Sequence, residues 1–503
     1  MRAWLMNISL VDGWFPATLF SVTAVLAAIL LGTAIWETVA GSRDGGKRTF
    51  AVVVCPVVIA IIAGIAGLVI AWLLSDVFVV FGVELGPHVV AWAGCGCAII
   101  GFAICYAVPH RGVLRAVAVV LTVFAVLSAA TGIDQAYGEY ATIGSLFGQD
   151  TYREADLTGM AKRSDLISVT QWKQEKADGS VSNIPAHGEV RKVNIPATTS
   201  HFEARKALVY LPPAALATAK HKPALPVILM MSGQPGSPGR VFAAGGIQTM
   251  MDDYAQHHGG LAPIVIAADQ LGDDSHNTLC VDSPVYGNAL TYLTKDVVNW
   301  VKANLPAAQQ AQDWAIAGFS QGATCSLQIG ANHPNLFGTI IPTGSELKPT
   351  NGSESSMISR FFQGDRAAYE NQIPVNAIRN HAPSTQTLVI GAGERDRESV
   401  RNVERIVPVA QQAGMHVTAV ESLGNAHDWH AVQDTLWYGL AVFGYNTGLS
   451  DAKPKLVDYP NLKRIFNLNH RTEVLYYDAI AGINSETIIW LSCAYGRSCR
   501  LDS

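Results

Sequence analysis

The chain has 503 residues, of which 49% are hydrophobic and only 15% are charged, and its mean hydropathy is +0.22. This composition is too apolar for an ordinary soluble protein, and the apolar excess lies in the first third of the chain. The net charge of -5 and the lack of a basic stripe give no reason to expect a nucleic-acid partner.

Residues 1–132 contain four apolar runs, each near the length of about 20 residues that crosses a bilayer as a helix. They cover approximately Pro16–Ala40, Phe50–Leu74, Val89–Val108 and Ala116–Thr131. The loop between the first two runs contains Arg43, Lys47 and Arg48, and the loop between the last two contains Arg111 and Arg115. The middle loop has no lysine or arginine. The positive-inside rule therefore predicts that both termini lie outside the cytoplasm. The runs carry little charge, so we expect an anchor rather than a transporter.

Residues 133–200 are predicted to connect this anchor to a second domain. The first part is rich in aromatic residues and glycine, as is typical where a chain leaves the headgroup zone. From Gln149 to about Gly188 the sequence is polar and weakly patterned, which indicates a surface linker. The linker is expected to end in a lead-in strand at Glu189–Ile195.

Residues 201–445 alternate short apolar runs with segments of helical period. The predicted strands are Ala207–Leu211, Val227–Met231, Ile264–Ala268, Trp314–Ala317, Gly338–Pro342, Thr387–Gly391 and His416–Glu421. Helical patterns occupy Leu290–Ala303, Gln321–Ala331 and Val400–Ala413. The alternation predicts a mainly parallel sheet with helices on both faces, which follows an α-helical membrane domain of four transmembrane helices.

The stretch from Gly318 to Gly322 has the G-x-S-x-G pattern of a nucleophile elbow, and it lies between a predicted strand and a predicted helix. Such a turn holds its serine at a helix N-terminus, where developing negative charge is stabilised. The pattern predicts Ser320 as a nucleophile and indicates the sheet of an α/β hydrolase.

This fold places a carboxylate and then a histidine after the nucleophile in chain order. Asp396 and Glu394 both follow the predicted strand Thr387–Gly391, and we favour Asp396 as the acid that orients the base. His427 and His430 both follow the last strand, and we favour His427 because it comes first on the turn. Glu394 and His430 stay as the alternatives.

An oxyanion hole needs two backbone N–H donors. One is expected to be Gln321, directly after the nucleophile. The second is expected from the loop Ser232–Gly239, where Pro235 has no N–H, which leaves Gln234. The segment Asp269–His276 follows another strand and is also expected to face the site.

The sequence has no zinc motif and no phosphate-binding loop, so neither a metal nor another cofactor is expected. Cys280, Cys325, Cys493 and Cys499 lie outside the predicted spans and allow three pairings. A Cys280–Cys325 disulfide would tie a preceding loop to the nucleophile helix, and Cys493 with Cys499 would close a small loop. Residues 446–503 have no predicted role, and their apolar run Ile483–Ala494 is too short to span a bilayer.

Several motifs resemble those of the actinobacterial membrane-anchored esterases, in the esterase D and mycolyltransferase-like branch of the α/β hydrolases. They are Ile195–Ser200, Val209–Pro213, Gly233–Pro238, Asp269–Gly272, Leu279–Ser283, Gly318–Cys325 and Gly393–Asp396. The resemblance covers residues 133–445, and it implies acyl-ester hydrolysis or acyl transfer with Ser320, Asp396 and His427 as the triad. Two departures are His201, where a glycine is expected, and the turn Gly424-Asn-Ala-His427 in place of Gly-Gly-His.

The expected function is that of a membrane-tethered, extracytoplasmic serine esterase or acyltransferase. The anchor would place the site beside the leaflet, which favours lipid or cell-envelope esters as substrates. Two alternatives are an inactive hydrolase fold that binds the envelope, and a transporter or sensor whose spans carry the function. The sequence leaves open both the oligomeric state and the choice between hydrolysis and transfer.

Overall fold

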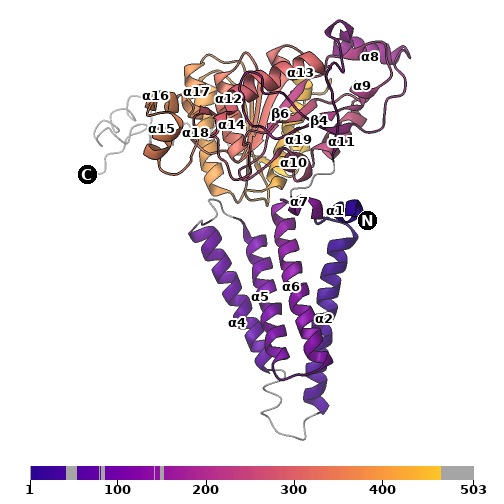
Figure 1. The fold of residues 1–503 in the computed structure, drawn as a ribbon, viewed down its shortest axis with the longest axis vertical. Coiled ribbons are helices and arrows are strands. Elements are labelled where there is room, and N and C mark those ends of the chain that lie inside the picture. The colour runs from indigo at the N-terminus through magenta and orange to yellow at the C-terminus, as the bar shows by residue number, and fades with distance from the viewer. Residues whose placement is uncertain are drawn as a thin grey trace, which may run out of the picture. The chain divides into compact units, whose positions relative to one another are not determined.

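The computed structural model describes residues 2–40, 54–78, 80, 85–140, 142–147 and 152–465. The helices that precede the sheet are α1 (Arg2–Met6), α2 (Trp14–Ala40), α4 (Cys55–Trp72), α5 (Pro87–Ala107), α6 (Val113–Tyr137) and α7 (Ile143–Leu146). A π-helical turn, η2 (Leu73–Val77), extends α4. The helices α2, α4, α5 and α6 are long and apolar enough to cross a membrane, as the sequence predicts (Figure 1).

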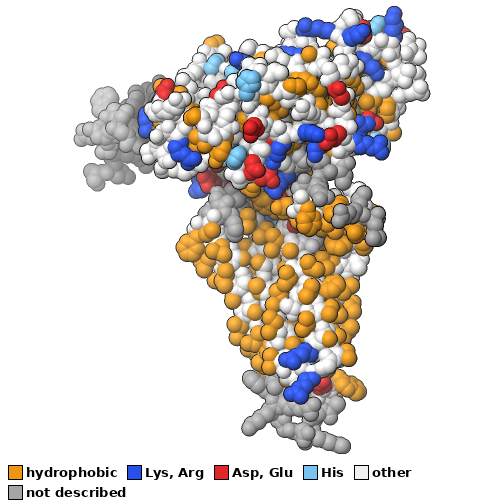
Figure 2. Space-filling view, in the orientation of Figure 1, with side chains coloured by type: hydrophobic (Ala, Val, Ile, Leu, Met, Phe, Trp, Pro, Cys, Tyr) orange, Lys and Arg blue, Asp and Glu red, His pale blue; other side chains and the backbone are white. Residues whose placement is uncertain are grey.

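These four helices bury few polar side chains, and two of these form a hydrogen bond between helices. Between α2 and α6, the hydroxyls of Thr23 and Ser128 form a hydrogen bond of 2.7 Å, which is the kind of contact that joins helices in an apolar solvent. The outer surface of the bundle is mostly hydrophobic (Figure 2). Two exposed basic residues, Arg111 in the turn between α5 and α6 and Arg115 in the first turn of α6, lie at one end of these helices. This distribution is the one expected of helices in contact with lipid.

The sheet has ten strands in the order β1-β3-β4-β7-β6-β10-β11-β12-β13-β14. Its strands are β1 (Arg153–Glu154), β3 (Glu189–Val193), β4 (Ala207–Leu211), β6 (Val227–Met231), β7 (Ile264–Ala267), β10 (Trp314–Phe319), β11 (Thr339–Thr343), β12 (Thr387–Gly393), β13 (His416–Ser422) and β14 (Leu462–Arg464). Strands β7, β6, β10, β11, β12 and β13 run parallel to one another, whereas β4 is antiparallel to both β3 and β7. Two short sheets pair β2 (Leu166–Ile167) with β5 (Lys222–Pro223) and β8 (Asp282–Ser283) with β9 (Gly287–Asn288).

Helices cover both faces of the sheet (Figure 1). The described α-helices of this domain are α8 (Val169–Ala177), α9 (Pro213–Leu216), α10 (Pro238–Ala243), α11 (Ile247–His257), α12 (Ala289–Thr291), α13 (Val298–Asn304), α14 (Gln321–Asn332), α15 (Glu354–Phe361), α16 (Arg366–Glu370), α17 (Pro374–Asn380), α18 (Arg397–Gln412) and α19 (Trp429–Asn446). The π-helical turn η4 (Tyr292–Val297) joins α12 to α13. Strands β6 and β10 are buried along their whole length, because helices pack on both of their faces.

The predicted architecture of the sheet domain is confirmed. Each strand predicted between residues 189 and 421 is present, and its ends agree with the prediction to within two residues. The strands are continuous apolar runs with helices between them, so the pattern that predicts them is local. The helices α10 and α11, which follow β6, were not predicted.

The expectation of a linker across Gln149–Gly188 is wrong in its middle part. Ser168 and Gln171 form a capping box that starts α8, and this helix buries Val169 and Trp172. The side chain of Trp172 has 0% exposure. The burial was missed because two apolar residues on a polar nine-residue helix make a weak periodic signal.

Three sequence expectations lie outside the described residues. They concern the basic loop of Arg43, Lys47 and Arg48, the apolar run Ile483–Ala494, and the pairing of Cys493 with Cys499.

The burial of Trp172 predicts that α8 contributes to stability. Trp172→Ala should lower the free energy of unfolding by about 3–5 kcal/mol, because it removes a large side chain from a closed space. Gln174→Ala, on the exposed side of the same helix, should change this free energy by less than about 0.5 kcal/mol. Thermal unfolding of the full-length chain in detergent compares the two variants. Equal melting temperatures for Trp172→Ala and the wild type would mean that α8 is a passive linker.

Candidate active site

The predicted site residues meet at the carboxyl edge of the parallel strands. Ser320 follows β10, the loop Ser232–Gly239 follows β6, Asp396 follows β12, and His427 follows β13. Because β10 pairs with β6 and β12 pairs with β13 in parallel, the segments that follow these strands leave the sheet at the same edge. Ligands of open α/β sheets bind at this edge.

Ser320 has the strained backbone of a nucleophile elbow. Its φ is +55°, a left-handed value that is uncommon for a residue with a Cβ, and α14 begins at the next residue. The turn is held by a hydrogen bond of 3.0 Å from Ser320 N to Thr343 O. A Cβ added at Gly322 would lie 2.4 Å from Ser232 O, so glycine is needed there for α14 to approach the end of β6.

His427 and Asp396 form a buried pair. Their side chains lie 2.5 Å apart, from His427 Nδ1 to Asp396 Oδ2, and their residues are 6% and 3% exposed. The other carboxylate oxygen, Asp396 Oδ1, accepts a hydrogen bond of 3.1 Å from Ser399 N at the start of α18. Asp396 is therefore both the N-cap of α18 and the partner of the imidazole.

In this pair, each group stabilises the charged form of the other. Burial favours the neutral imidazole, but the Asp396 carboxylate outweighs burial and raises the pKa of His427 above its usual 6.5. Burial likewise favours the protonated carboxyl, but His427 and the hydrogen bonds from Ser399 lower the pKa of Asp396. The Asp396 carboxylate can thus stabilise an imidazolium that forms during a reaction.

The loop that carries His427 is closed by Asp428. Its two carboxylate oxygens accept hydrogen bonds from Ala426 N at 2.7 Å and from Ala431 N at 3.0 Å, so the side chain clasps the loop on both sides of the histidine. The Phe319 ring packs against the imidazole with a centroid distance of 4.9 Å. This clasp starts α19 and was not predicted from the sequence.

The second ring nitrogen, His427 Nε2, is buried and has no hydrogen-bond partner among the described residues. No hydrogen bond between Ser320 and His427 is present in this structure. The structure therefore brings the histidine and the carboxylate together, and Ser320, which directly follows the Phe319 ring that packs on the imidazole, has no hydrogen bond to the base. Catalytic hydrogen bonds commonly tighten only when substrate is bound.

The two alternative residues point elsewhere. Glu394 is exposed, and it accepts hydrogen bonds of 2.9 Å from Gly424 N and 2.9 Å from Lys463 Nζ. His430 Nε2 lies 3.1 Å from Gln135 O, at the end of α6. The geometry therefore favours Asp396 over Glu394 and His427 over His430.

The expected oxyanion donors lie beside the nucleophile. Gln321 is the first residue of α14, so its backbone N–H has no carbonyl partner within the helix. Gly233 and Gln234 line a cavity together with Ser320, and a Cβ added at Gly233 would lie 3.3 Å from Ser320 Cβ. The backbone N–H groups of Gln321 and Gln234 are therefore the candidates to stabilise a developing oxyanion.

The segment Asp269–His276 supports the loop Ser232–Gly239 through polar contacts. The buried Gln270 side chain donates a hydrogen bond of 2.7 Å to Ser232 O and one of 3.3 Å to Gln321 Oε1. Asp269, which is 0% exposed, pairs with Arg205 at 2.8 Å. Arg205 in turn donates a hydrogen bond of 2.9 Å to Gly236 O. The expectation that this segment faces the site therefore has a structural basis, as a support for the loop.

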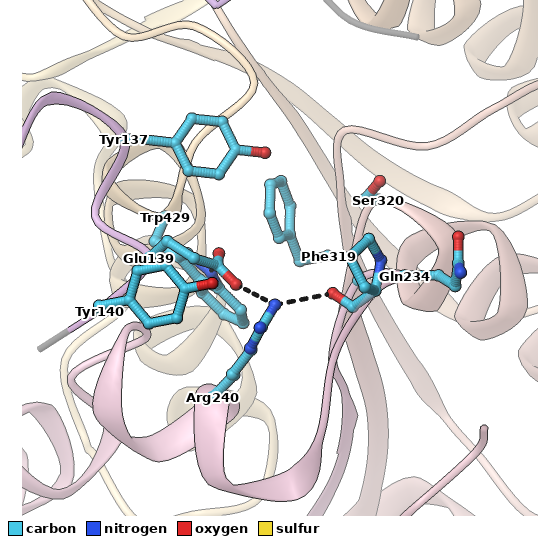
Figure 3. Close-up of a pocket in the computed structure, with 10 residues that line it drawn as sticks. Tyr137, Glu139, Tyr140, Gln234, Arg240, Phe319, Ser320 and Trp429 are labelled. Atoms are coloured by element: carbon cyan, nitrogen blue, oxygen red, sulfur yellow. Dashed lines mark hydrogen bonds and ion pairs between the residues drawn. The ribbon is translucent and has the colours of Figure 1, made fainter. Parts of the chain in front are cut away.

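A cavity of about 210 Å³ opens in front of Ser320. Its lining includes Tyr137, Glu139 and Tyr140, which belong to the end of α6 and the residues directly after it. Figure 3 shows these three residues on one side of the cavity and Ser320 with Gln234 on the other. The remaining lining residues are Gly233, Pro235, Arg240, Phe319 and Trp429.

Residues 137–140, the predicted membrane-exit segment, were not predicted from the sequence to contribute to the site. Glu139 forms an ion pair with Arg240 across the cavity wall, and both side chains are largely buried. Burial raises the pKa of the Glu139 carboxyl, although Arg240 opposes this effect. Aromatic residues after a span are typical of the headgroup zone, so nothing local in the sequence indicates that they line a site.

A disulfide joins Cys280 to Cys325. Cys325 lies on α14, so the bond ties this helix to the segment that precedes β8. Among the described residues, no cluster of histidine, cysteine or carboxylate side chains is arranged to hold a metal ion.

Residues 199–441 match the model of a protein family described as "Putative esterase". The chain is 30% identical over 315 residues to an uncharacterized protein of Corynebacterium glutamicum, a match that covers 61% of this chain and 71% of that protein.

Many solved structures are also similar to the chain, and two serve as examples. An S-formylglutathione hydrolase from Agrobacterium tumefaciens is 16% identical, with a TM-score of 0.43, and the match covers 54% of this chain and 99% of that one. The MPT51 protein of Mycobacterium tuberculosis is 14% identical, with a TM-score of 0.40, over 52% of this chain and 98% of that one.

The family model spans the sheet domain from before β4 to the middle of α19, and so it includes every residue of the candidate site except those from the membrane-exit segment. The chain therefore belongs to the esterase family of α/β hydrolases, and it is a serine hydrolase or acyltransferase.

Proposed function

We propose that this protein is a membrane-tethered, extracytoplasmic serine esterase or acyltransferase that acts on lipid or cell-envelope esters. The observation that carries the proposal is the buried pair of His427 and Asp396 beside the strained Ser320. A nucleophile, an acid and a base in this chain order form the triad of α/β hydrolases.

In the first half of the reaction, Ser320 Oγ attacks the ester carbonyl carbon and His427 Nε2 takes the hydroxyl proton. The carbonyl oxygen becomes an oxyanion, which accepts hydrogen bonds from the backbone N–H groups of Gln321 and Gln234. The carbon–oxygen bond of the ester then breaks. The alcohol leaves with the proton from His427, and the acyl group stays on Ser320.

In the second half, a water molecule or an acceptor hydroxyl enters where the alcohol left. His427 removes its proton while its oxygen attacks the acyl carbon, and the same two N–H groups stabilise the second oxyanion. Collapse of this intermediate returns the proton to Ser320 Oγ and releases an acid or a new ester. Asp396 keeps the imidazole in one orientation throughout, and it stabilises the positive charge on the ring.

The location of the site supports a substrate that resides at the membrane. Tyr137, the last residue of the membrane-spanning helix α6, lines the same cavity as Ser320. A substrate held in the leaflet is presented to the site at high effective concentration. The Cys280–Cys325 disulfide and the basic residues Arg111 and Arg115 support an extracytoplasmic domain, because disulfides persist in oxidising compartments and basic loops stay in the cytoplasm.

The triad is tested by paired substitutions in the full-length protein. Ser320→Ala should abolish labelling by a fluorophosphonate probe, and His427→Ala and Asp396→Asn should lower kcat for a p-nitrophenyl ester by about 10³-fold or more. The matched controls are His430→Ala and Glu394→Gln, which should retain kcat to within about tenfold, well short of the loss on removing a base. If His430→Ala lost turnover while His427→Ala kept it, the base would be His430. The same comparison of Glu394→Gln with Asp396→Asn tests the acid. A folded wild type that neither labels nor turns over would favour an inactive binding module.

The raised pKa of His427 predicts the pH dependence. The base must be neutral to accept a proton, so kcat/KM should fall as the pH drops through a midpoint above 6.5. Asp396→Asn removes the strongest influence that opposes burial and leaves only the weaker ones of Asp428 and Glu346, so the midpoint should move to lower pH while the rate falls. A pH profile of soluble-ester turnover measures both midpoints. A midpoint that is the same in the two proteins would contradict the assigned pairing.

The orientation of the chain predicts which tags an external protease can reach. In intact spheroplasts, an epitope tag at the C-terminus should be removed by protease, whereas a tag between α2 and α4 should be cleaved only after lysis. Immunoblotting before and after lysis measures both. The reverse pattern would place the hydrolase domain in the cytoplasm.

A further inference from the structure

The carboxylate of Glu139 lies where the membrane anchor meets the catalytic loops. Glu139 follows α6 by two residues, and its side chain is 16% exposed. It lines the cavity opposite Ser320 (Figure 3). A carboxylate that is this well buried needs donors to replace its lost water.

The two carboxylate oxygens of Glu139 bind two different parts of the site. Oε1 pairs with the Arg240 guanidinium, and Oε2 accepts a hydrogen bond of 3.1 Å from Trp429 Nε1. Arg240 starts from α10, directly after the loop Ser232–Gly239, and its Nη1 donates a hydrogen bond of 3.1 Å to Pro235 O in that loop. One oxygen of Glu139 is thereby connected to the loop that supplies the proposed oxyanion donor Gln234.

The other oxygen is connected to the loop of the base. Trp429 is two residues after His427, is 1% exposed, and packs against the Phe319 ring with a centroid distance of 5.0 Å. Phe319 directly precedes Ser320 and also packs against the imidazole of His427. A shift of the Trp429 ring would therefore displace Phe319, and with it both Ser320 and the imidazole of His427.

We propose that Glu139 is a positioning residue. It fixes the loop Ser232–Gly239 through Arg240 and the loop that carries His427 through Trp429, and so it sets the position of one loop relative to the other. The membrane-exit segment is then a working part of the catalytic site as well as its tether. This inference rests on the proposed function of Ser320 as the nucleophile.

The test uses the full-length protein in lipid nanodiscs and p-nitrophenyl acetate, a soluble ester too small to need the membrane. A fluorophosphonate probe counts the active sites, so that kcat is expressed per labelled site. Glu139→Ala should lower kcat by about 10- to 100-fold with KM changed by less than about threefold, because the loss lies in the alignment of the reacting groups. Glu139→Gln keeps an oxygen that can accept from Trp429 but loses the charge, so its kcat should lie between those of Glu139→Ala and the wild type.

The coupling to Arg240 is tested in the same assay. If the two residues act as one unit, the double variant Glu139→Ala with Arg240→Ala should lose no more than about threefold beyond the worse single variant. The matched control is Glu154→Ala, which removes an exposed carboxylate paired with Lys206 and should leave kcat unchanged.

Two results would overturn the proposal. One is a kcat per labelled site in Glu139→Ala that equals that of the wild type. This holds even if the number of labelled sites falls, because such a result would show a role in folding alone. The other is full multiplication of the two single losses in the double variant. A wild type that shows neither labelling nor turnover would instead refute the proposed function, which separates the two failures.

Discussion

The buried pair of His427 and Asp396 is the interaction on which the rest of the site depends. Neither group could be buried alone without a large desolvation cost, and each is held in place by the other. The pairing is possible because β12 and β13 run parallel along their whole length, which brings the two following loops together. Asp396 and Asp428 also cap α18 and α19, so the helices that cover this part of the sheet start from the same loops as the chemistry.

Much of the sheet and of the proposed triad could be predicted because their signals are local. Buried parallel strands are continuous apolar runs, and an elbow is five adjacent residues whose glycines are needed for close packing. The acid and the base then follow from chain order. The sequence favours Asp396 over Glu394 and His427 over His430 but leaves both alternatives open, because only the three-dimensional contacts show that Glu394 and His430 bind other groups than this pair.

Features that join distant parts of the chain could not be predicted. Glu139 and Arg240 are about a hundred residues apart, and each alone is an unremarkable charge near a turn. The aromatic residues at the end of α6 and after it match the composition expected where a chain leaves a membrane. Because that explanation accounts for them, the sequence gives no sign that they line the cavity. In the same way, α8 exposes a polar surface, and only the packing of the whole domain reveals that Trp172 is enclosed.

Two arginines restrict how the loop Ser232–Gly239 can move. Arg240 holds Pro235 O and Arg205 holds Gly236 O, so two successive carbonyl groups are fixed by cations from different elements. A peptide plane rotates only if its carbonyl oxygen can swing away, and here each rotation would break a charge-assisted hydrogen bond. The peptide planes that follow Pro235 and Gly236 are therefore held in place. When substrate binds, this part of the loop is expected to move as a rigid unit and not to flip a peptide.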